Sequence, residues 1–149
     1  MQLETILTPG RTLCGVPGSS KKRVLENIAQ SISEDISSLD SNLLFDSLVA
    51  RERLGSTGLG HGIAIPHCRM KSCSKVIGAL IRLNEPVDFD AIDGEPVDLI
   101  FVLIVPEEAH AEHLQVLAHL AEMFNDEAFC QQLRQCEDNA ALYQLATGH

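Results

Sequence analysis

The stretch L-V-A-R-E-R-L-G-S-T-G-L-G-H-G-I-A-I-P-H-C-R, residues 48–69, joins the end of a predicted helix to a short apolar strand through a glycine-dense turn. Four glycines fall within eight residues of it: Gly55, Gly58, Gly60 and Gly62. Glycine at this density indicates tight bends, positive φ angles or close approach to a partner. The turn leads through an apolar run to Pro66 and delivers His67 directly behind that rigid residue. We interpret His67 as the candidate working residue, because loops held by a rigid scaffold carry function.

The size and charge of the chain narrow the classes of protein it can belong to. Its 149 residues are enough for one domain with a single core, and we predict one domain over residues 1–149. A hydrophobic content of 45% is ordinary for a globular protein. With 21 acidic and 11 basic residues, the net charge of −10 argues against a nucleic-acid partner, which would require a basic surface.

The sequence shows no sign of export or membrane insertion. Residues 1–4 lack the basic head and apolar core of a signal peptide, and the longest apolar run, residues 99–105, has only the length of a strand. The five cysteines are odd in number and follow no C-x-x-C spacing. We therefore expect a cytoplasmic protein whose thiols are free in a reducing compartment.

Two helices are predicted before the glycine turn. The first begins after Ser19 or Ser20, ends near residue 35, and has a buried stripe at helical spacing: Val24, Leu25, Ile28, Ala29 and Ile32. The second begins at Asp40 or Ser41 and ends near residue 53. Its expected inward face is Leu44, Phe45, Leu48 and Val49. Arg51 falls in line with Leu44 and Leu48, at the edge of this buried face.

Strands and further helices follow in an order that indicates the fold class. Strands are predicted at 12–16, 63–65, 76–83 and 97–105, and the last is nearly all apolar, which is typical of a central strand covered on both faces. Helices are predicted at 109–124, 127–136 and 139–146. The order β-α-α-β-β-β-α-α-α predicts a three-layer α/β/α sandwich around a mixed sheet.

Several catalytic motifs do not fit the glycine turn. The segment G-S-T-G-L-G-H-G has no Lys-Ser/Thr after its glycines, so it is not a nucleotide phosphate-binding loop. Its glycines do not make G-x-G-x-x-G, and the chain contains no G-x-S-x-G elbow.

A metal site is the alternative that the six histidines leave open. His110 and His113 stand three residues apart on one predicted helix face, in neither H-E-x-x-H nor H-x-x-E-H spacing. A zinc site made of His67, His110 and His113 is one reading of this pattern. The more ordinary reading of a lone histidine near apolar residues is a satisfied core or boundary group, and His67 departs from it because glycines and Pro66 position it at a strand end.

The segment R-E-R-L-G-S-T-G-L-G-H-G-I-A-I-P-H resembles the active-site segment of phosphotransferase-system enzyme IIA domains of the fructose/mannitol type, most closely the nitrogen-regulatory branch of that family. Two later segments, F-D-A-I-D-G-E-P-V-D-L at 89–99 and E-H-L-Q-V-L at 112–117, are similar to the family as well. The resemblance spans nearly the whole chain.

The resemblance implies roles for individual residues. It implies that His67 accepts the phosphoryl group, that His113 lies beside it, and that Arg51 is an active-site arginine that stabilises phosphate. His61 departs from the pattern, because mannitol-type relatives carry a carboxylate there, which puts a phosphate-neighbour role for this position in doubt. No cofactor and no metal are implied, because arginine and histidine donors can neutralise the phosphoryl oxygens.

The resemblance also implies partners. The phosphoryl donor would be an HPr-like phosphocarrier protein of the nitrogen-related system (NPr), which carries a phosphohistidine. The 149 residues hold no sugar-binding membrane domain and no IIB domain, so we expect a free-standing regulatory protein. Its targets, by family analogy, would be other proteins such as potassium transporters or sensor kinases. The competing hypothesis is a non-catalytic protein-binding module whose histidines serve only structure and docking.

Overall fold

The computed structural model describes residues 2–108 and 112–149. Five α-helices and six strands are present in this part of the chain, preceded by two 3₁₀ helices, Leu3–Thr5 and Pro9–Arg11. The first elements are β1 (Thr12–Val16), α1 (Lys21–Asp35), α2 (Ser41–Leu54), β2 (Gly58–Gly60) and β3 (Ile63–Ala64). The remainder are β4 (His67–Met70), β5 (Ile77–Val87), β6 (Val97–Pro106), α3 (Glu112–Phe124), α4 (Glu127–Gln135) and α5 (Asn139–Thr147).

The strands form one mixed sheet in the order β1-β5-β6-β3-β2, and β4 also pairs with β6. β6 is antiparallel to β5 and parallel to both β3 and β4. β3 pairs with β6 at Leu99 and Ile100, and β4 pairs with it from Leu103 onward, so the two short strands lie end to end along β6. The prediction that this apolar strand is central is therefore confirmed.

Side chains of β6 alternate between two cores, one on each face of the sheet. Ile100, Val102 and Ile104 belong to the core under α1 and α2. Leu99, Phe101, Leu103 and Val105 belong to the core shared with the first 3₁₀ helix and with α3, α4 and α5. Successive side chains of β6 point to opposite faces, and both faces are buried, which explains why the segment is continuously apolar.

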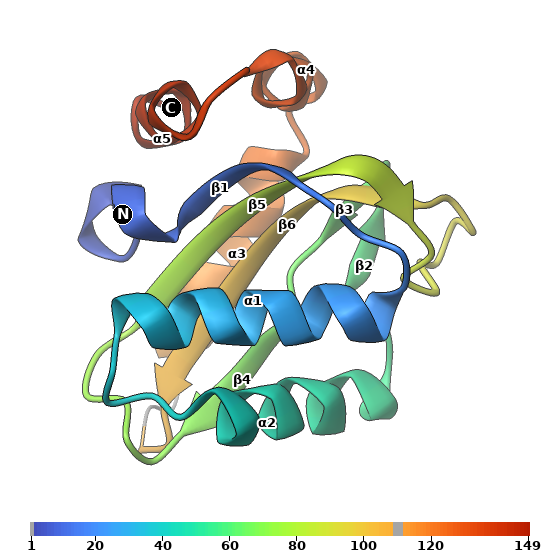
Figure 1. The fold of residues 1–149 in the computed structure, drawn as a ribbon. Coiled ribbons are helices and arrows are strands. Elements are labelled where there is room, and N and C mark those ends of the chain that lie inside the picture. The colour runs from blue at the N-terminus through green and yellow to red at the C-terminus, as the bar shows by residue number, and fades with distance from the viewer. Residues whose placement is uncertain (1, 109–111) are drawn as a thin grey trace.

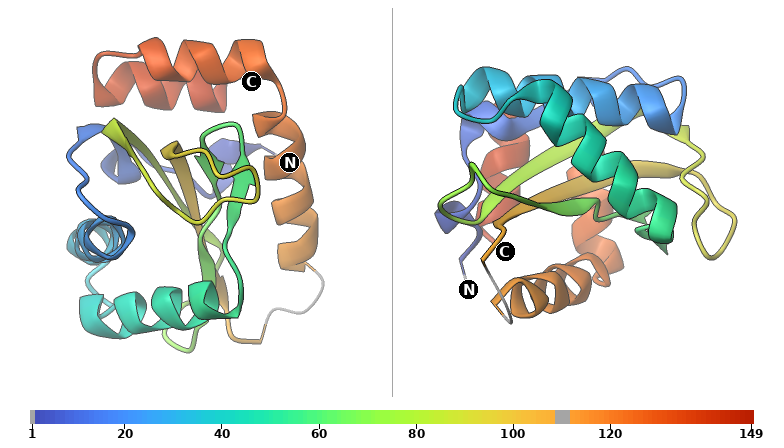
Figure 2. Two further views of the ribbon diagram at one scale, coloured as in Figure 1. Left: turned by 90° about the vertical axis from the view of Figure 1, so that its right-hand side faces the viewer. Right: turned by 90° about the horizontal axis from the view of Figure 1, so that it is seen from below.

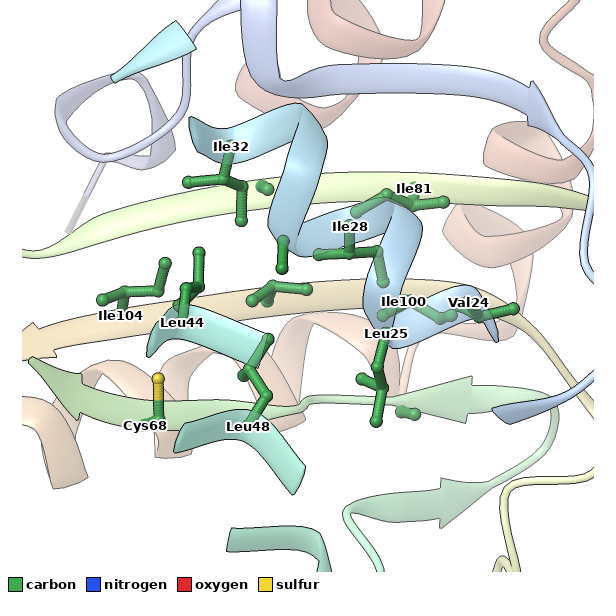
Figure 3. Close-up of a cluster of buried hydrophobic side chains, with 14 of the residues drawn as sticks. Val24, Leu25, Ile28, Ile32, Leu44, Leu48, Cys68, Ile81, Ile100 and Ile104 are labelled. Carbon is green, nitrogen blue, oxygen red and sulfur yellow. The ribbon is translucent and has the colours of Figure 1, made fainter. Parts of the chain in front are cut away.

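Helices α1 and α2 begin at the residues that the sequence indicated. The Ser20 hydroxyl accepts a hydrogen bond from the Arg23 N–H at 3.1 Å, and the Asp40 carboxylate accepts one from the Leu43 N–H at 3.0 Å. Both are N-caps that satisfy otherwise unpaired donors of the first turn. Figure 3 shows the inward side chains of α1 and α2 pointing toward those of β4, β5 and β6, as their helical spacing predicted.

The helices cover both faces of the sheet, so the predicted three-layer α/β/α sandwich is confirmed (Figures 1 and 2). α1 and α2 make one outer layer, and α3, α4 and α5 make the other. No helix in the described residues is of a length and apolarity that would let it cross a membrane.

The sheet has two strands that the sequence analysis did not predict. β2 and β4 are three and four residues long, and β5 continues to Val87, past the predicted end at residue 83. The expected strand at 63–65 ends at Ala64. The predicted beginning of the helix at residue 109 lies outside the described residues.

Candidate functional site

His67 is the first residue of β4, directly after the gap that separates β3 from β4, a break between the two short strands that pair with β6. Pro66 has no N–H to donate to β6, but its carbonyl accepts from the Leu103 N–H at 2.9 Å. The Ile65 N–H is turned the other way and donates to the Thr57 carbonyl at 3.1 Å. The break thus anchors the backbone on both sides of the proline and sets the start of β4, where His67 is half-buried.

The two ring nitrogens of His67 have different partners. Nδ1 lies 2.9 Å from the Ile65 carbonyl oxygen, which can only accept, so we assign the proton of the neutral ring to Nδ1. Nε2 then carries the lone pair and accepts a hydrogen bond from Nε–H of Arg51 at 3.3 Å. The ring is held in the tautomer that leaves Nε2 as the nucleophilic atom.

The surroundings of His67 keep the imidazole uncharged. Burial is the largest influence and lowers the pKa of His67 below its ordinary value of 6.5. The hydrogen bond to Ile65 and the Glu52 carboxylate raise the pKa, while Arg51 and His113 lower it further. The net direction is downward, so His67 is neutral at pH 7.

Arg51 reaches His67 because of its place on α2. It lies in the last turn of the helix, in line with Leu44 and Leu48, which are fully buried against the sheet. Its Nη1–H donates to the Gly55 carbonyl at 2.9 Å, just beyond the helix end. One end of the guanidinium is thereby fixed while Nε points at the imidazole.

A pocket of about 440 Å³ brings the predicted site residues together. His67, Arg51 and His113 all line it, and the rest of its wall is Ser47, Ala50, Leu54, Cys68, Arg69, Leu103 and Val105. His113 is half-buried near the described start of α3, and its buried Nδ1 has no hydrogen-bond partner among the described residues. One of the residues that line the pocket thus carries an unsatisfied hydrogen-bonding atom.

Sequence reasoning missed two charged residues near this pocket. Arg69 is exposed, stands two positions after His67 on β4 and lines the same pocket. Alternation along a strand was the signal, but β4 itself was not predicted.

The second is Glu52, whose side chain is 6% exposed and pairs with Lys21 Nζ at 2.7 Å. Glu52 also accepts hydrogen bonds from the backbone N–H and the hydroxyl of Thr57, so it ties α1, the end of α2 and the glycine turn into one unit behind Arg51. Nothing local in R-E-R revealed these partners.

His61 lies in a different place from the other predicted site residues. It is at the β2–β3 turn with a φ of +57°, and its N–H donates to the Asp93 carboxylate at 2.9 Å. Its carbonyl accepts from Arg134 Nη2 at 2.7 Å, and the residue lines a second pocket beside α4. It is not among the residues that line the His67 pocket.

The alternative prediction was a zinc site made of His67, His110 and His113. His110 lies outside the described residues, and the described ranges contain no cluster of three or more His, Cys, Asp or Glu side chains arranged to hold a metal ion.

The chain matches a known protein family over most of its length. The family described as phosphoenolpyruvate-dependent sugar phosphotransferase system, EIIA 2, matches residues 5–147. The chain is 53% identical over 145 residues to a nitrogen regulatory protein of Pseudomonas aeruginosa, which covers 97% of this chain and 94% of that protein.

Solved structures agree with this match. The crystal structure of nitrogen regulatory protein IIA-Ntr from Neisseria meningitidis has a TM-score of 0.90 at 41% identity, covering 97% of this chain and 99% of that one. The structure of IIA mannitol from Escherichia coli, at 18% identity, shares the fold with a TM-score of 0.75, covering 91% of this chain and 96% of that one.

Proposed function

The chain belongs to the EIIA 2 family of the phosphoenolpyruvate-dependent sugar phosphotransferase system, and from this premise we propose that it is a regulatory phosphocarrier that accepts a phosphoryl group on His67. In this proposal residues 1–149 form one EIIA type-2 domain that acts in the cytoplasm. The donor is an HPr-like phosphocarrier protein of the nitrogen-related system (NPr). The observation that carries the proposal is the Nδ1 hydrogen bond to Ile65, which leaves the Nε2 lone pair in the pocket beside Arg51.

The transfer begins with the lone pair of His67 Nε2. Nε2 attacks the phosphorus of the donor phosphohistidine, forming a new N–P bond while the donor's N–P bond breaks and its electron pair returns to the donor imidazole. The Arg51 N–H that occupies the lone pair must move aside by a small distance. The Nδ1 proton stays on His67, because the Ile65 carbonyl continues to accept it.

Charge on the phosphoryl oxygens is neutralised by residues around the pocket. Once Nε2 is occupied, the Arg51 guanidinium faces the phosphoryl group with a fixed cationic fork. His113, which also lines the pocket, supplies a further hydrogen bond. Because Arg51 is already beside Nε2, only a small movement of its guanidinium is needed to meet the developing charge.

The direct test is phosphorylation of the purified protein by a phosphorylated HPr-like carrier. We expect one phosphoryl group on the wild type, labile to acid and stable to base as a phosphoramidate, and none on His67→Ala. His119→Ala is the matched control, because His119 lies on α3 but outside the pocket. Full labelling of His67→Ala would overturn the assignment, and no labelling of the wild type would favour the docking-module hypothesis.

We further propose that the phosphate decides which target proteins bind. Leu54, at the pocket rim, is 85% exposed, so an unmodified protein offers an apolar contact beside His67. Phosphorylation adds about two negative charges there, and an apolar partner would have to desolvate them at high cost. A partner that presents an arginine would instead gain charge-assisted hydrogen bonds. Potassium transporters and sensor kinases are the target classes that family analogy suggests.

Target selection can be measured by titrating one such target with unmodified protein, phosphorylated protein and His67→Glu, which carries one charge. We expect the affinity to differ strongly between the first two forms and to be intermediate for His67→Glu. Equal affinity for the unmodified and phosphorylated forms would show that the phosphate is carried and signals nothing.

A further inference from the structure

Cys14 and Arg82 lie side by side on adjacent strands, at a distance from the His67 pocket. They are register partners in the parallel pair of β1 and β5. Arg82 directs Nη2–H at Cys14 Sγ at 3.1 Å and Nε–H at the same sulfur at 3.4 Å. Two N–H donors of one guanidinium therefore point at the sulfur, so a thiolate formed on Cys14 would lie against a permanent positive charge.

The backbone of a second cysteine, Cys136, lies next to this pair. Cys136 directly follows α4, and its carbonyl accepts a hydrogen bond from Cys14 Sγ at 3.2 Å, while its own thiol donates to the Gln132 carbonyl at 3.5 Å. The Cys14 N–H donates to the Asn139 side chain at 2.7 Å, which fixes the α4–α5 turn against β1. Cys14 and Cys136 are only partly buried, and both pack against the same core.

We propose that Cys14 and Cys136 form a peroxide-responsive thiol pair that closes an intramolecular disulfide. The deprotonated Cys14 sulfur attacks one oxygen of hydrogen peroxide, the O–O bond breaks, and hydroxide leaves and is protonated to water, giving a sulfenic acid on Cys14. The Cys136 sulfur then loses its proton and attacks Cys14 Sγ, forming the S–S bond and releasing a second water. The two thiols are oxidised and the peroxide is reduced.

The remaining cysteines provide a contrast within the same chain. Cys68, Cys73 and Cys130 are buried, and burial together with the neighbouring Cys73 raises the pKa of the Cys68 thiol to about 12. Cys68 and Cys73 are thus a second pair of neighbouring cysteines, but both are buried, whereas Cys14 is partly exposed to solvent. Burial raises the pKa of Cys136 as well, which suits a thiol that stays protonated until Cys14 is oxidised.

The pair lies away from the residues proposed for phosphoryl transfer. β1 ends the sheet order on one side, whereas β4, which carries His67, pairs with the central strand β6. Oxidation is therefore expected to leave His67 free to accept a phosphoryl group, so the two modifications can be tested separately.

The experiment treats the reduced protein with hydrogen peroxide, alkylates the remaining thiols and measures intact mass. We expect a product lighter by two hydrogen atoms, two fewer alkylated thiols and a Cys14–Cys136 cross-link in a non-reducing peptide map. The oxidised protein should also melt at a higher temperature, because a link between positions 122 residues apart restricts the unfolded chain.

Variants separate the roles of the three residues. Cys14→Ser should abolish the link, Cys136→Ser should leave a Cys14 sulfenic acid that dimedone traps, and Arg82→Ala should slow that trapping severalfold. Cys73→Ser, from the buried pair, is the matched control and should behave as wild type. A link that joins two chains or involves Cys68, an undiminished trapping rate in Arg82→Ala, or five alkylatable thiols after peroxide would each overturn the proposal.

Discussion

At the scale of the residue, burial and the Arg51 guanidinium both lower the pKa of His67. The pH dependence of His67 is therefore a test of the site. We expect a pKa below 6.5 for His67, measured by NMR titration of its ring protons. Phosphoryl acceptance should stay constant above pH 6.5 and decline below it, as Nε2 becomes protonated. A pKa above 6.5 would contradict the arrangement described here.

The same lowered pKa couples His67 to folding. The unfolded chain takes up this proton at a higher pH than the folded chain, so the contribution of His67 to stability is complete above pH 6.5 and is lost as the pH falls through the folded pKa. His67→Gln should remove this part of the pH dependence, which urea unfolding of both proteins between pH 5 and pH 8 would show.

Arg51 and its neighbour Arg53 offer a matched pair of variants. Arg51→Ala should slow phosphorylation by roughly 10²–10³, or about 2.7–4 kcal/mol of barrier, because one charge-stabilising donor is lost. Arg51→Lys should restore only part of the rate, since lysine lacks the planar fork. Arg53→Ala, which lies outside the pocket, should be near normal in single-turnover measurements. Near-normal rates for Arg51→Ala would remove it from the site.

His113→Ala should slow transfer by a similar factor of about 10²–10³ while the fold persists. The reason is the loss of an imidazole that lines the pocket and has an unsatisfied Nδ1 among the described residues. Circular dichroism would check the fold, and His119→Ala would serve as the control on the same helix. An unaffected rate would leave His113 as a wall residue only.

At the scale of the element, the turn between β2 and β3 depends on Gly62. Its φ is +81°, and a Cβ there would lie 2.6 Å from Arg134 Nη2 and 3.0 Å from the Asp98 carboxylate. Arg134 and Asp98 form an ion pair at 3.1 Å. Gly62→Ala should therefore destabilise the protein by about 1–3 kcal/mol in urea unfolding, from backbone strain and displacement of this ion pair. Gly94→Ala is the control: its φ is +72° with open space around it, so only the strain remains.

Elements with a strong periodic signal were predictable, and short ones were not. The buried stripe of α1 and the caps at Ser20 and Asp40 follow from helical spacing and N-cap chemistry, which act within a few residues. β2 and β4 hold three and four residues, too few for an alternation to stand out, and their pairing with β3 and β6 is decided by contacts remote in sequence.

The candidate site shows the same division. Arg51 was predictable because it continues the helical line of Leu44 and Leu48 to the edge of the buried face. Glu52 was not, because its ion pair with Lys21 joins two helices whose packing the sequence pattern does not specify. The proximity of His113 to His67 came from resemblance, since no local pattern relates α3 to β4.

At the scale of the whole molecule, β6 divides and supports both cores. Phe101 is fully buried at its centre and lies 6.2 Å from the ring of Phe124 on α3. Phe101→Ala should cost about 3–5 kcal/mol of unfolding free energy, because it leaves a cavity between the sheet and α3. Phe101→Leu should cost less, since it keeps most of the volume. A change below about 1 kcal/mol for the alanine variant would contradict the central role of β6.

In the proposed transfer, the hydrogen bond between His67 Nδ1 and the Ile65 carbonyl would also decide which of two isomers of phosphohistidine forms. With Nδ1 committed to the backbone, we expect the τ-isomer, phosphorylated on the nitrogen farther from Cβ. Isomer-resolved chromatography or phosphorus NMR of the modified protein would identify it directly. A target protein that recognises the π-isomer would meet a ring whose Nδ1 is turned toward Ile65 and already hydrogen-bonded. The backbone of a single residue would thus determine the chemical form in which the proposed signal is presented.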